Sequence, residues 1–289
     1  MRVTIITATF NSATTLRDTL MSVARQTYKN IEHIIIDGGS IDDTLAIAES
    51  FKHVHTIISE PDKGIYDAMN KGINLATGDI IGILNSDDFF PNIYVLERIV
   101  KSFQEQNCDA TYGDLNYVNR DNTAIIKRKW IAGGYSRNLF YRGWMPPHPT
   151  FYVKRSCYEK YGLFNLSFKV AADYDILLRF LFVNHINAFY IPAVLVHMRA
   201  GGISNASFRQ RIGTHLEDHR VWKINEQKPK WYTLAFKPLR KIKQFILPNV
   251  KLLGNPGKSS YEKMQAPIIT FKYPDEQCLH PYSEKNHQK

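Results

Sequence analysis

Short apolar runs alternate with segments of helical periodicity between residues 2 and 103. The runs predict four strands, at residues 3–8, 31–36, 54–58 and 80–84. Each strand is followed by apolar residues three or four positions apart, such as Leu16, Leu20 and Val23, which is typical of one buried helix face. Four successive βα units predict an α/β fold with a largely parallel central sheet flanked by helices.

The pattern changes twice further along the chain. More strands are predicted at residues 110–112, 115–118, 123–126, 151–153 and 189–196, and helices at 156–161 and after 172. We therefore expect a main domain of residues 1–204 in two halves, about 1–106 and 107–204. A basic helical extension is expected at 205–247. Residues 248–289 lack helical periodicity and are expected to form a poorly ordered tail.

Polar and mostly acidic residues follow all four of the first strands. They are Thr9 and Asn11, then Asp37, then Glu60 and Asp62, then Asn85, Asp87 and Asp88. Ligands of parallel sheets bind at the carboxyl ends of the strands, so these side chains should converge on one edge. Two adjacent aspartates are costly to bury, so a divalent metal, an arginine or lysine, or bulk water must lie nearby, and the set of acids suits a metal-bound nucleotide diphosphate. The simpler alternative is that such acids cap the following helices, as expected for Asp42 and Asp43.

Charge and composition narrow the possibilities only in part. The chain has 289 residues and a formal net charge of +10, which indicates an anionic partner such as nucleotide phosphates, an anionic membrane or nucleic acid. Its three cysteines form no Cys-x-x-Cys pair, and neither a signal peptide nor a membrane span is evident, so a cytoplasmic location is expected. The chain contains no Gly-x-Gly-x-x-Gly and no P-loop motif, which disfavours dinucleotide oxidoreductases and P-loop NTPases.

Five motifs in order carry a resemblance to a known family. They are TATFN at 7–11, DGGSIDDT at 37–44, EPDKGIYDAMNKG at 60–72, NSDD at 85–88 and AD at 172–173. In these motifs the chain resembles the family 2 glycosyltransferases of the GT-A fold, in particular bacterial exopolysaccharide and colanic-acid-type members. The resemblance spans about residues 3–204, and the Gln-x-x-Arg-Trp element of processive synthases is absent from the sequence.

The resemblance implies an inverting enzyme. It would transfer one sugar from a nucleotide-diphosphate sugar, with a UDP-sugar preferred, to a glycan or lipid-linked acceptor in the synthesis of exopolysaccharide, capsule or O-antigen. The first half would bind the donor and the second half the acceptor. Mn²⁺ or Mg²⁺ would be the cofactor, and nucleic acid would not be a partner.

The family's site residues carry over by position. Asp173 matches the catalytic base, and the metal would be held by Asp87, Asp88 and His197. His148 and Asp175 are expected on the acceptor side. The residues expected to bind the nucleotide-sugar are Thr7, Thr9, Asn11, Asp37, Asp62, Lys63, Asn85 and Asp87.

Two departures from the family pattern leave alternatives open. Asn85 stands where an aspartate is usual, so the division of ribose and metal contacts between Asp87 and Asp88 is open. Ala172 replaces the usual glutamate, and Asp175 is a rival for the role of base. For His148 and His197 a structural role is an equal alternative. For Asp173 the alternative role is a helix cap.

Residues 228–246 combine lysine and arginine with tryptophan, tyrosine and phenylalanine. This pattern is typical of a surface-lying anchor, here at the inner face of the cytoplasmic membrane, but also of a helix packed on the main domain. Two other functions remain as alternatives. A sugar nucleotidyltransferase would usually have a glycine-rich basic loop after the first strand, which Phe10, Asn11 and Ser12 do not supply. A non-catalytic basic binding module would explain the charge but not four acidic strand ends.

Overall fold

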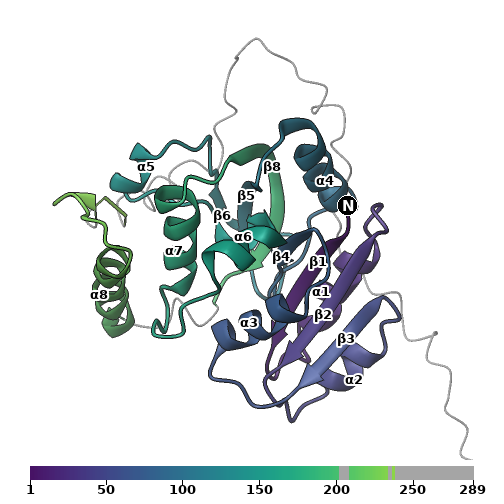
Figure 1. The fold of residues 1–289 in the computed structure, drawn as a ribbon. Helices are drawn as coiled ribbons and strands as arrows, with labels where there is room; N and C mark the ends of the chain where they lie inside the picture. Colours follow the sequence, from purple (N-terminus) through teal and green to yellow (C-terminus); the bar gives the residue numbers. More distant parts are fainter. Residues whose placement is uncertain (202–207, 234–235, 238–289) are drawn as a thin grey trace, which may run out of the picture.

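The computed structural model describes residues 1–201, 208–233 and 236–237 (Figure 1). The tail expected from residue 248, and the part of the basic aromatic segment after residue 237, lie outside these residues. Within the described ranges, no helix is both long and apolar enough to cross a bilayer.

One mixed sheet of eight strands forms the centre, in the order β3-β2-β1-β4-β7-β5-β6, with β8 paired to β5. β1, β2, β3 and β4 run parallel, as does the pair β5 and β8, whereas β7 runs antiparallel to both of its neighbours. The strands are β1 (Val3–Thr9), β2 (Ile31–Asp37), β3 (Val54–Ser59), β4 (Ile80–Ile83), β5 (Ala110–Val118), β6 (Ile126–Trp130), β7 (Tyr152–Lys154) and β8 (Ala188–Arg199).

Helices cover both faces of this sheet (Figure 1). They are α1 (Leu16–Ala24), α2 (Thr44–Glu49), α3 (Ile65–Leu75), α4 (Val95–Gln106), α5 (Asn138–Tyr141), α6 (Arg155–Tyr161), α7 (Ala172–Leu177) and α8 (Phe208–Ile224). A 3-10 turn, η1 (His148–Thr150), precedes β7, and a π-helix, η2 (Leu178–Val183), continues α7.

Alternating residues of the parallel strands divide the core between the two faces. Ile6 and Ile36 pack with Met69 of α3 on one face. Ile5 packs with Ile99 of α4 on the other. This alternation follows from the period of two in a strand.

The carboxyl ends of the first strands lie at one edge, as the sequence predicts. Thr9 at the end of β1 pairs with Asp37 at the end of β2, and Asp37 pairs with Ser59 at the end of β3. The backbone N–H of Leu84, directly after β4, donates to Ile6 O of β1 at 3.0 Å. We call this the carboxyl edge of the sheet.

Several strands of the second half differ from the prediction. The two strands expected at 110–112 and 115–118 are one strand, β5, with register shifts opposite β8 around Gly113 and Asp114. The strand expected at 123–126 lies later, at Ile126–Trp130, and carries the basic residues 127–129. β6 pairs only with β5 and is an edge strand, so lysine side chains are tolerated there and the apolar pattern is weak.

The helix expected after residue 172 changes its hydrogen bonding at Leu178. The N–H of Asn184 bonds to Arg179 O, five residues earlier, at 3.0 Å, which is the π-helical spacing. α8 packs beside α7 (Figure 1), with Trp222 fully buried against Tyr141 and Phe182. The described part of the predicted C-terminal extension therefore shares the core of the main domain.

Candidate active site

Asp37 organises the turn after β2. Its carboxylate accepts hydrogen bonds from the N–H groups of Gly39 (3.1 Å) and Ser40 (2.9 Å), and from the hydroxyls of Ser40 and Ser59. The side chain is fully buried. Asp37 thus links the ends of β2 and β3, and it shapes the turn in addition to any contact with a ligand.

The loop after β1 closes against the same turn. Asn11 has a φ of 46°, its N–H donates to Ser40 Oγ at 2.8 Å, and its Oδ1 accepts from the N–H of Ile41 at 3.0 Å. Thr9 Oγ1 is buried without a hydrogen-bond partner among the described residues. An unpaired buried hydroxyl at the carboxyl edge is a candidate contact for a bound ligand.

Three other residues predicted to bind the donor lie in different surroundings. Thr7 is fully buried inside the sheet, where Oγ1 lies 3.1 Å from Nε2 of His33. Asp62 lies beside the turn of Gly38 and accepts from the N–H of Gly64 at 2.7 Å. Lys63 is exposed. Thr7 is thus engaged within the sheet, while Asp62 reaches the turn of Asp37.

The half-buried Asn85 and the buried Asp88 form a pair after β4. Asn85 Nδ2 donates to Asp88 Oδ2 at 3.1 Å, while Oδ1 of each residue is buried without a partner among the described residues. Asp88 is fully buried, and burial, with the charge of Asp87 second, raises its pKa well above the usual range. A buried carboxyl of this kind either keeps its proton or meets a cation.

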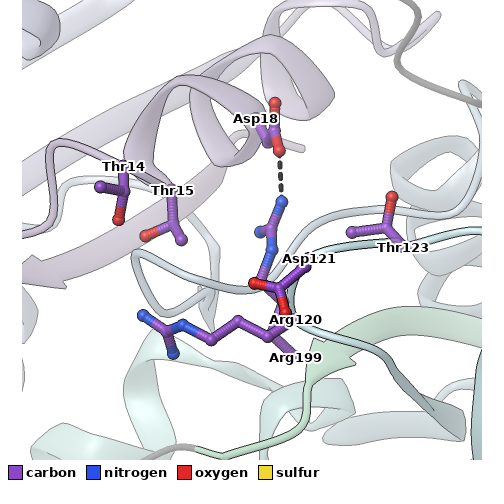
Figure 2. Close-up of a pocket in the computed structure, with 7 residues that line it drawn as sticks. All are labelled: Thr14, Thr15, Asp18, Arg120, Asp121, Thr123 and Arg199. Atoms are coloured by element: carbon purple, nitrogen blue, oxygen red, sulfur yellow. Dashed lines mark hydrogen bonds and ion pairs between the residues drawn. The ribbon is translucent and has the colours of Figure 1, made fainter.

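Asp87 is half-buried next to two arginines. Burial raises its pKa, and the charges of Arg120 and Arg199 partly offset this effect. Arg199 is buried, donates to Asp87 O at 2.8 Å and forms an ion pair with Asp18 of α1. Figure 2 shows this ion pair at a cavity of about 380 Å³ lined by Thr14, Thr15, Asp18, Arg120, Asp121, Thr123 and Arg199.

His197 approaches this region from β8. A β-bridge joins it to Phe89, and the two rings meet edge to face with centroids 5.3 Å apart. Burial lowers its pKa to about 4, so the ring is neutral near pH 7. Nε2 lies 3.4 Å from Asn116 Nδ2. A neutral imidazole can bind a metal through a ring nitrogen that is not protonated.

The residues present fit a hard divalent cation. The orphaned Oδ1 atoms of Asn85 and Asp88 are buried oxygen ligands of the kind that Mg²⁺ and Mn²⁺ prefer, and a cation would compensate the buried carboxylate. Across residues 1–201, 208–233 and 236–237, no three His, Cys, Asp or Glu side chains gather closely enough to hold a metal by themselves. Ligand atoms from a bound phosphate would therefore have to complete the coordination.

Asp173 lies in the first turn of α7, half-buried, and its Oδ1 accepts from the N–H of Tyr174 at 2.7 Å. Tyr66 of α3 lies beside it: the Tyr66 hydroxyl donates to Val170 O at 3.0 Å. Burial, followed by the charge of Asp173, raises the Tyr66 pKa far above its usual value. A carboxylate at a helix N-terminus is stabilised as the anion, which is the form that a general base requires.

Tyr117 of β5 is affected by the charges of both Asp88 and Asp173. Burial raises its pKa, nearby Arg128 lowers it, and the charges of Asp88 and Asp173 both raise it. The Arg128 guanidinium lies 3.7 Å from the centroid of the Tyr117 ring. The charges of two acids that are far apart in the sequence therefore both raise the pKa of one tyrosine.

Asp175 and His148, both predicted on the acceptor side, have structural partners. Asp175 is 2% exposed, pairs with Arg179 at 3.2 Å and accepts from Asn225 Nδ2 at 2.7 Å. This engagement disfavours it as a rival base. The half-buried His148 ring packs edge to face on Phe164, and burial lowers its pKa to about 4.

Sequence reasoning missed Arg199, Tyr117 and Tyr66 as members of this site. The motif at 60–72 contains Tyr66, and the basic residues 127–129 mark the strand whose arginine covers Tyr117. No comparable signal identifies Arg199, whose partner Asp18 is 181 positions away.

Comparison with known proteins identifies a family, related sequences and solved structures that this chain resembles. The model of the family described as Glycosyl transferase family 2 matches residues 4–166. A PGL/p-HBAD biosynthesis glycosyltransferase of Mycobacterium bovis (strain BCG / Pasteur 1173P2) is 33% identical over 209 residues, which is 70% of this chain and 78% of the relative. Glycosyltransferase GlyG of Streptococcus pneumoniae serotype 4 is 31% identical over 123 residues, 41% of this chain and 40% of the relative.

Two solved structures share the fold. S. aureus TarS 1-349 in complex with UDP-GlcNAc has a TM-score of 0.60 at 17% identity, covering 78% of this chain and 65% of that chain. The mannosyltransferase PcManGT from Pyrobaculum calidifontis, in complex with GDP-Man and Mn²⁺, has a TM-score of 0.58 at 22% identity, covering 85% of this chain and 69% of that one. The GT-A fold expected from the sequence is confirmed.

Proposed function

Because this chain belongs to glycosyl transferase family 2, we propose that it transfers a single sugar from a UDP-sugar to a lipid-linked glycan, inverting the anomeric carbon, in surface polysaccharide biosynthesis. The observation that carries the proposal is a set of buried polar atoms without partners among the described residues at the carboxyl edge: Thr9 Oγ1, Asn85 Oδ1 and Asp88 Oδ1. A bound nucleotide-sugar and its cation would supply the partners that these atoms lack.

The donor would lie along the carboxyl edge. The orphaned Thr9 hydroxyl and the turn held by Asp37 would meet the nucleoside, with Asn11 and Asp62 closing the turn around it. Asn85 and Asp87 would reach the ribose and the diphosphate. TarS was solved with UDP-GlcNAc and with UDP, which supports a UDP-sugar as the first donor to test.

Mn²⁺ or Mg²⁺ would be held by Asp87 and Asp88 together with oxygen atoms of the donor diphosphate. His197 stays the candidate for a further contact, since among the described residues it does not gather with the two acids into a three-residue site. Such an ion, when bound, neutralises charge on the departing diphosphate. Arg199 holds the backbone of Asp87 and so fixes the acidic loop in place. The Mn²⁺ in the PcManGT complex supports this cofactor.

Asp173 would act as the general base. It is only half-buried, so an acceptor hydroxyl can approach it, and the N-terminus of α7 favours its charged form. The carboxylate would take the proton of the acceptor hydroxyl as the hydroxyl oxygen attacks the anomeric carbon from the face opposite the diphosphate. Attack from that face inverts the configuration.

The acceptor and the membrane contact rest on the C-terminal region. Trp231 is 93% exposed, while Lys230 covers the ring of Tyr141 at 5.2 Å and so ties this segment to the main domain. An exposed tryptophan in a basic segment fits a peripheral position at the inner membrane face, near a lipid-linked acceptor. Flotation with anionic liposomes should fall for Trp231→Ala in the full chain; equal flotation would contradict the membrane contact.

The central experiment measures donor binding and turnover separately. Thermal shift with UDP-, GDP- and dTDP-sugars, with and without Mn²⁺, identifies the donor, because a ligand stabilises the folded state according to its affinity. With the best donor, Asp173→Asn should lose at least about 100-fold in transfer, as expected for removal of a general base, and keep its donor-induced shift. Turnover at a tenth of the parent rate would contradict the assignment of the base.

A further inference from the structure

The segment before α7 is held by a side chain from α8. The backbone N–H groups of Lys169, Val170 and Ala171 point to the carboxylate of Glu217, with donor–acceptor distances of 3.1, 2.9 and 3.0 Å. Lys169 donates to Oε1, while Val170 and Ala171 both donate to Oε2. One carboxylate therefore satisfies three consecutive backbone donors just ahead of Asp173.

Tyr66 of α3 also holds this turn, through a backbone carbonyl group. The Tyr66 hydroxyl donates to Val170 O at 3.0 Å, so the peptide groups around Val170 are held by Glu217 through N–H and by Tyr66 through C=O. Ala171 O then accepts from the N–H of Asp175 at 2.9 Å, the first hydrogen bond of α7. The direction of that first turn, and of Asp173 within it, follows from how residues 169–171 are held.

The contacts of α8 with α7 continue along one helix face. Trp222 Nε1 donates to the Tyr174 hydroxyl at 2.9 Å, and Asn225 Nδ2 donates to Asp175 Oδ1 at 2.7 Å. Trp222 and Asn225, three residues apart, lie on one side of the helix, and Glu217, five residues before Trp222, lies at the margin of the same half of the helix surface. Glu217 is thus the end of a continuous contact, and the burial of Trp222 keeps its position constant.

We propose that Glu217 is a positioning residue for Asp173. Its carboxylate holds the turn at 169–171 so that the first turn of α7 directs Asp173 towards the acceptor hydroxyl. The inference rests on the proposed function, since it requires Asp173 to be the base. It also assigns a role to α8, which lies beyond the region at 4–166 matched by the family model.

The test compares kcat with donor affinity. Glu217→Ala leaves three backbone donors without their partner, and a base displaced by about 1 Å can cost on the order of 100-fold in rate. We expect kcat to fall between about 10- and 100-fold while the Kd for the donor stays within about twofold. Glu217→Gln keeps an acceptor oxygen and should recover part of the rate.

Arg220→Ala is the matched control. Arg220 is on the same helix and donates to Ser167 O at 3.2 Å, so it contacts the same segment but none of the three N–H groups. Its kcat should stay within about threefold of the parent, as for a surface contact. A loss equal to that of Glu217→Ala would show that any loosening of α8 is sufficient, and would overturn the specific role of Glu217.

A double-mutant cycle with Asp173→Glu, which keeps a carboxylate but displaces it, tests whether Glu217 acts through Asp173. If it does, adding Glu217→Ala should cost less than about threefold more, because the base is already misplaced. A multiplicative loss, or a Glu217→Ala kcat within threefold of the parent, overturns the positioning role alone. Turnover by Asp173→Asn at a tenth of the parent rate overturns the base assignment and the positioning role together.

Discussion

Asn85 donates a hydrogen bond of 3.1 Å to the buried carboxyl of Asp88, at the position where the expected family motif has an acid. The amide compensates for part of the burial of Asp88 without adding charge. One acid fewer also leaves a weaker set of ligands for a cation. This exchange leads to the first prediction.

Asn85→Asp should destabilise the metal-free protein and strengthen its response to metal. The change removes a buried donor and places a second carboxyl beside Asp88, which should lower the free energy of unfolding in EDTA by about 1–3 kcal/mol. Mn²⁺ should restore more stability to this variant than to the parent. Urea unfolding with and without Mn²⁺ measures both effects.

Ser86→Ala is the control, since Ser86 contacts Ser12 in the same loop at 2.9 Å and is not a proposed ligand. Its response to Mn²⁺ should equal that of the parent. An Asn85→Asp protein as stable in EDTA as the parent would contradict the role of the amide.

The raised pKa of Asp88 predicts a pH dependence of stability. The folded state holds the Asp88 proton more tightly than the unfolded chain, so this group lowers the free energy of unfolding as pH rises from its usual pKa near 3.8 through the raised value. Above the raised value the loss is complete. Asp88→Asn should therefore be more stable than the parent at pH 7 in EDTA, with the difference disappearing near pH 3.8.

Urea unfolding in EDTA between pH 4 and 8 measures that difference, and Asp121→Asn, which removes an exposed acid of the adjoining cavity, serves as the control. If the free energy of unfolding of Asp88→Asn and of the parent changes with pH in the same way, Asp88 is not held protonated by burial. Mn²⁺ should reverse the order, since it stabilises only the protein with the carboxylate.

Asp37→Ala should cost both stability and donor binding. The carboxylate accepts from two N–H groups and two hydroxyls, and without it the N–H groups of Gly39 and Ser40 lose their partner. We expect a loss of about 3 kcal/mol in the free energy of unfolding and no thermal shift with the donor. The control is Asp43→Ala, at a helix start without a side-chain capping bond, which should change the free energy of unfolding by less than about 0.5 kcal/mol. A loss in Asp43→Ala as large as that in Asp37→Ala would contradict the prediction.

Arg128→Ala should reduce kcat/KM about three- to thirtyfold, the range expected from the loss of a partly buried contact between a cation and an aromatic ring. The change removes the cation at Tyr117, between the two acidic groups. Lys127→Ala removes an equal charge from an exposed neighbour on β6 and should leave kcat/KM within twofold. Equal losses in both variants would assign the effect to net charge.

The arrangement of the first half follows from its sequence because its contacts are local. Each apolar run and the helix after it lie next to one another in space, and the right-handed crossover rule places the acids at one edge. The convergence of Thr9, Asp37 and Asn85 on that edge was therefore predictable.

The second half depends on pairs that no local pattern reveals. Glu217 holds Val170 from 47 positions away, and Asn225 holds Asp175 from 50. Asp175 has one partner, Arg179, at the four-residue spacing of a helical ion pair, whereas its second partner, Asn225, is recognisable only in three dimensions. Thr7 differs for another reason: it lies two residues before the end of β1, inside the sheet, where its hydroxyl contacts His33.

Gly82 and Tyr152 are in close contact where the two halves of the sheet meet. A Cβ at Gly82 of β4 would lie 2.0 Å from the ring of Tyr152 in β7, the short strand through which β4 is joined to β5. The bare backbone of Gly82 thus lets an aromatic ring lie across the junction. A chimaera that takes its donor half from one family member and its acceptor half from another must inherit these two positions as a pair.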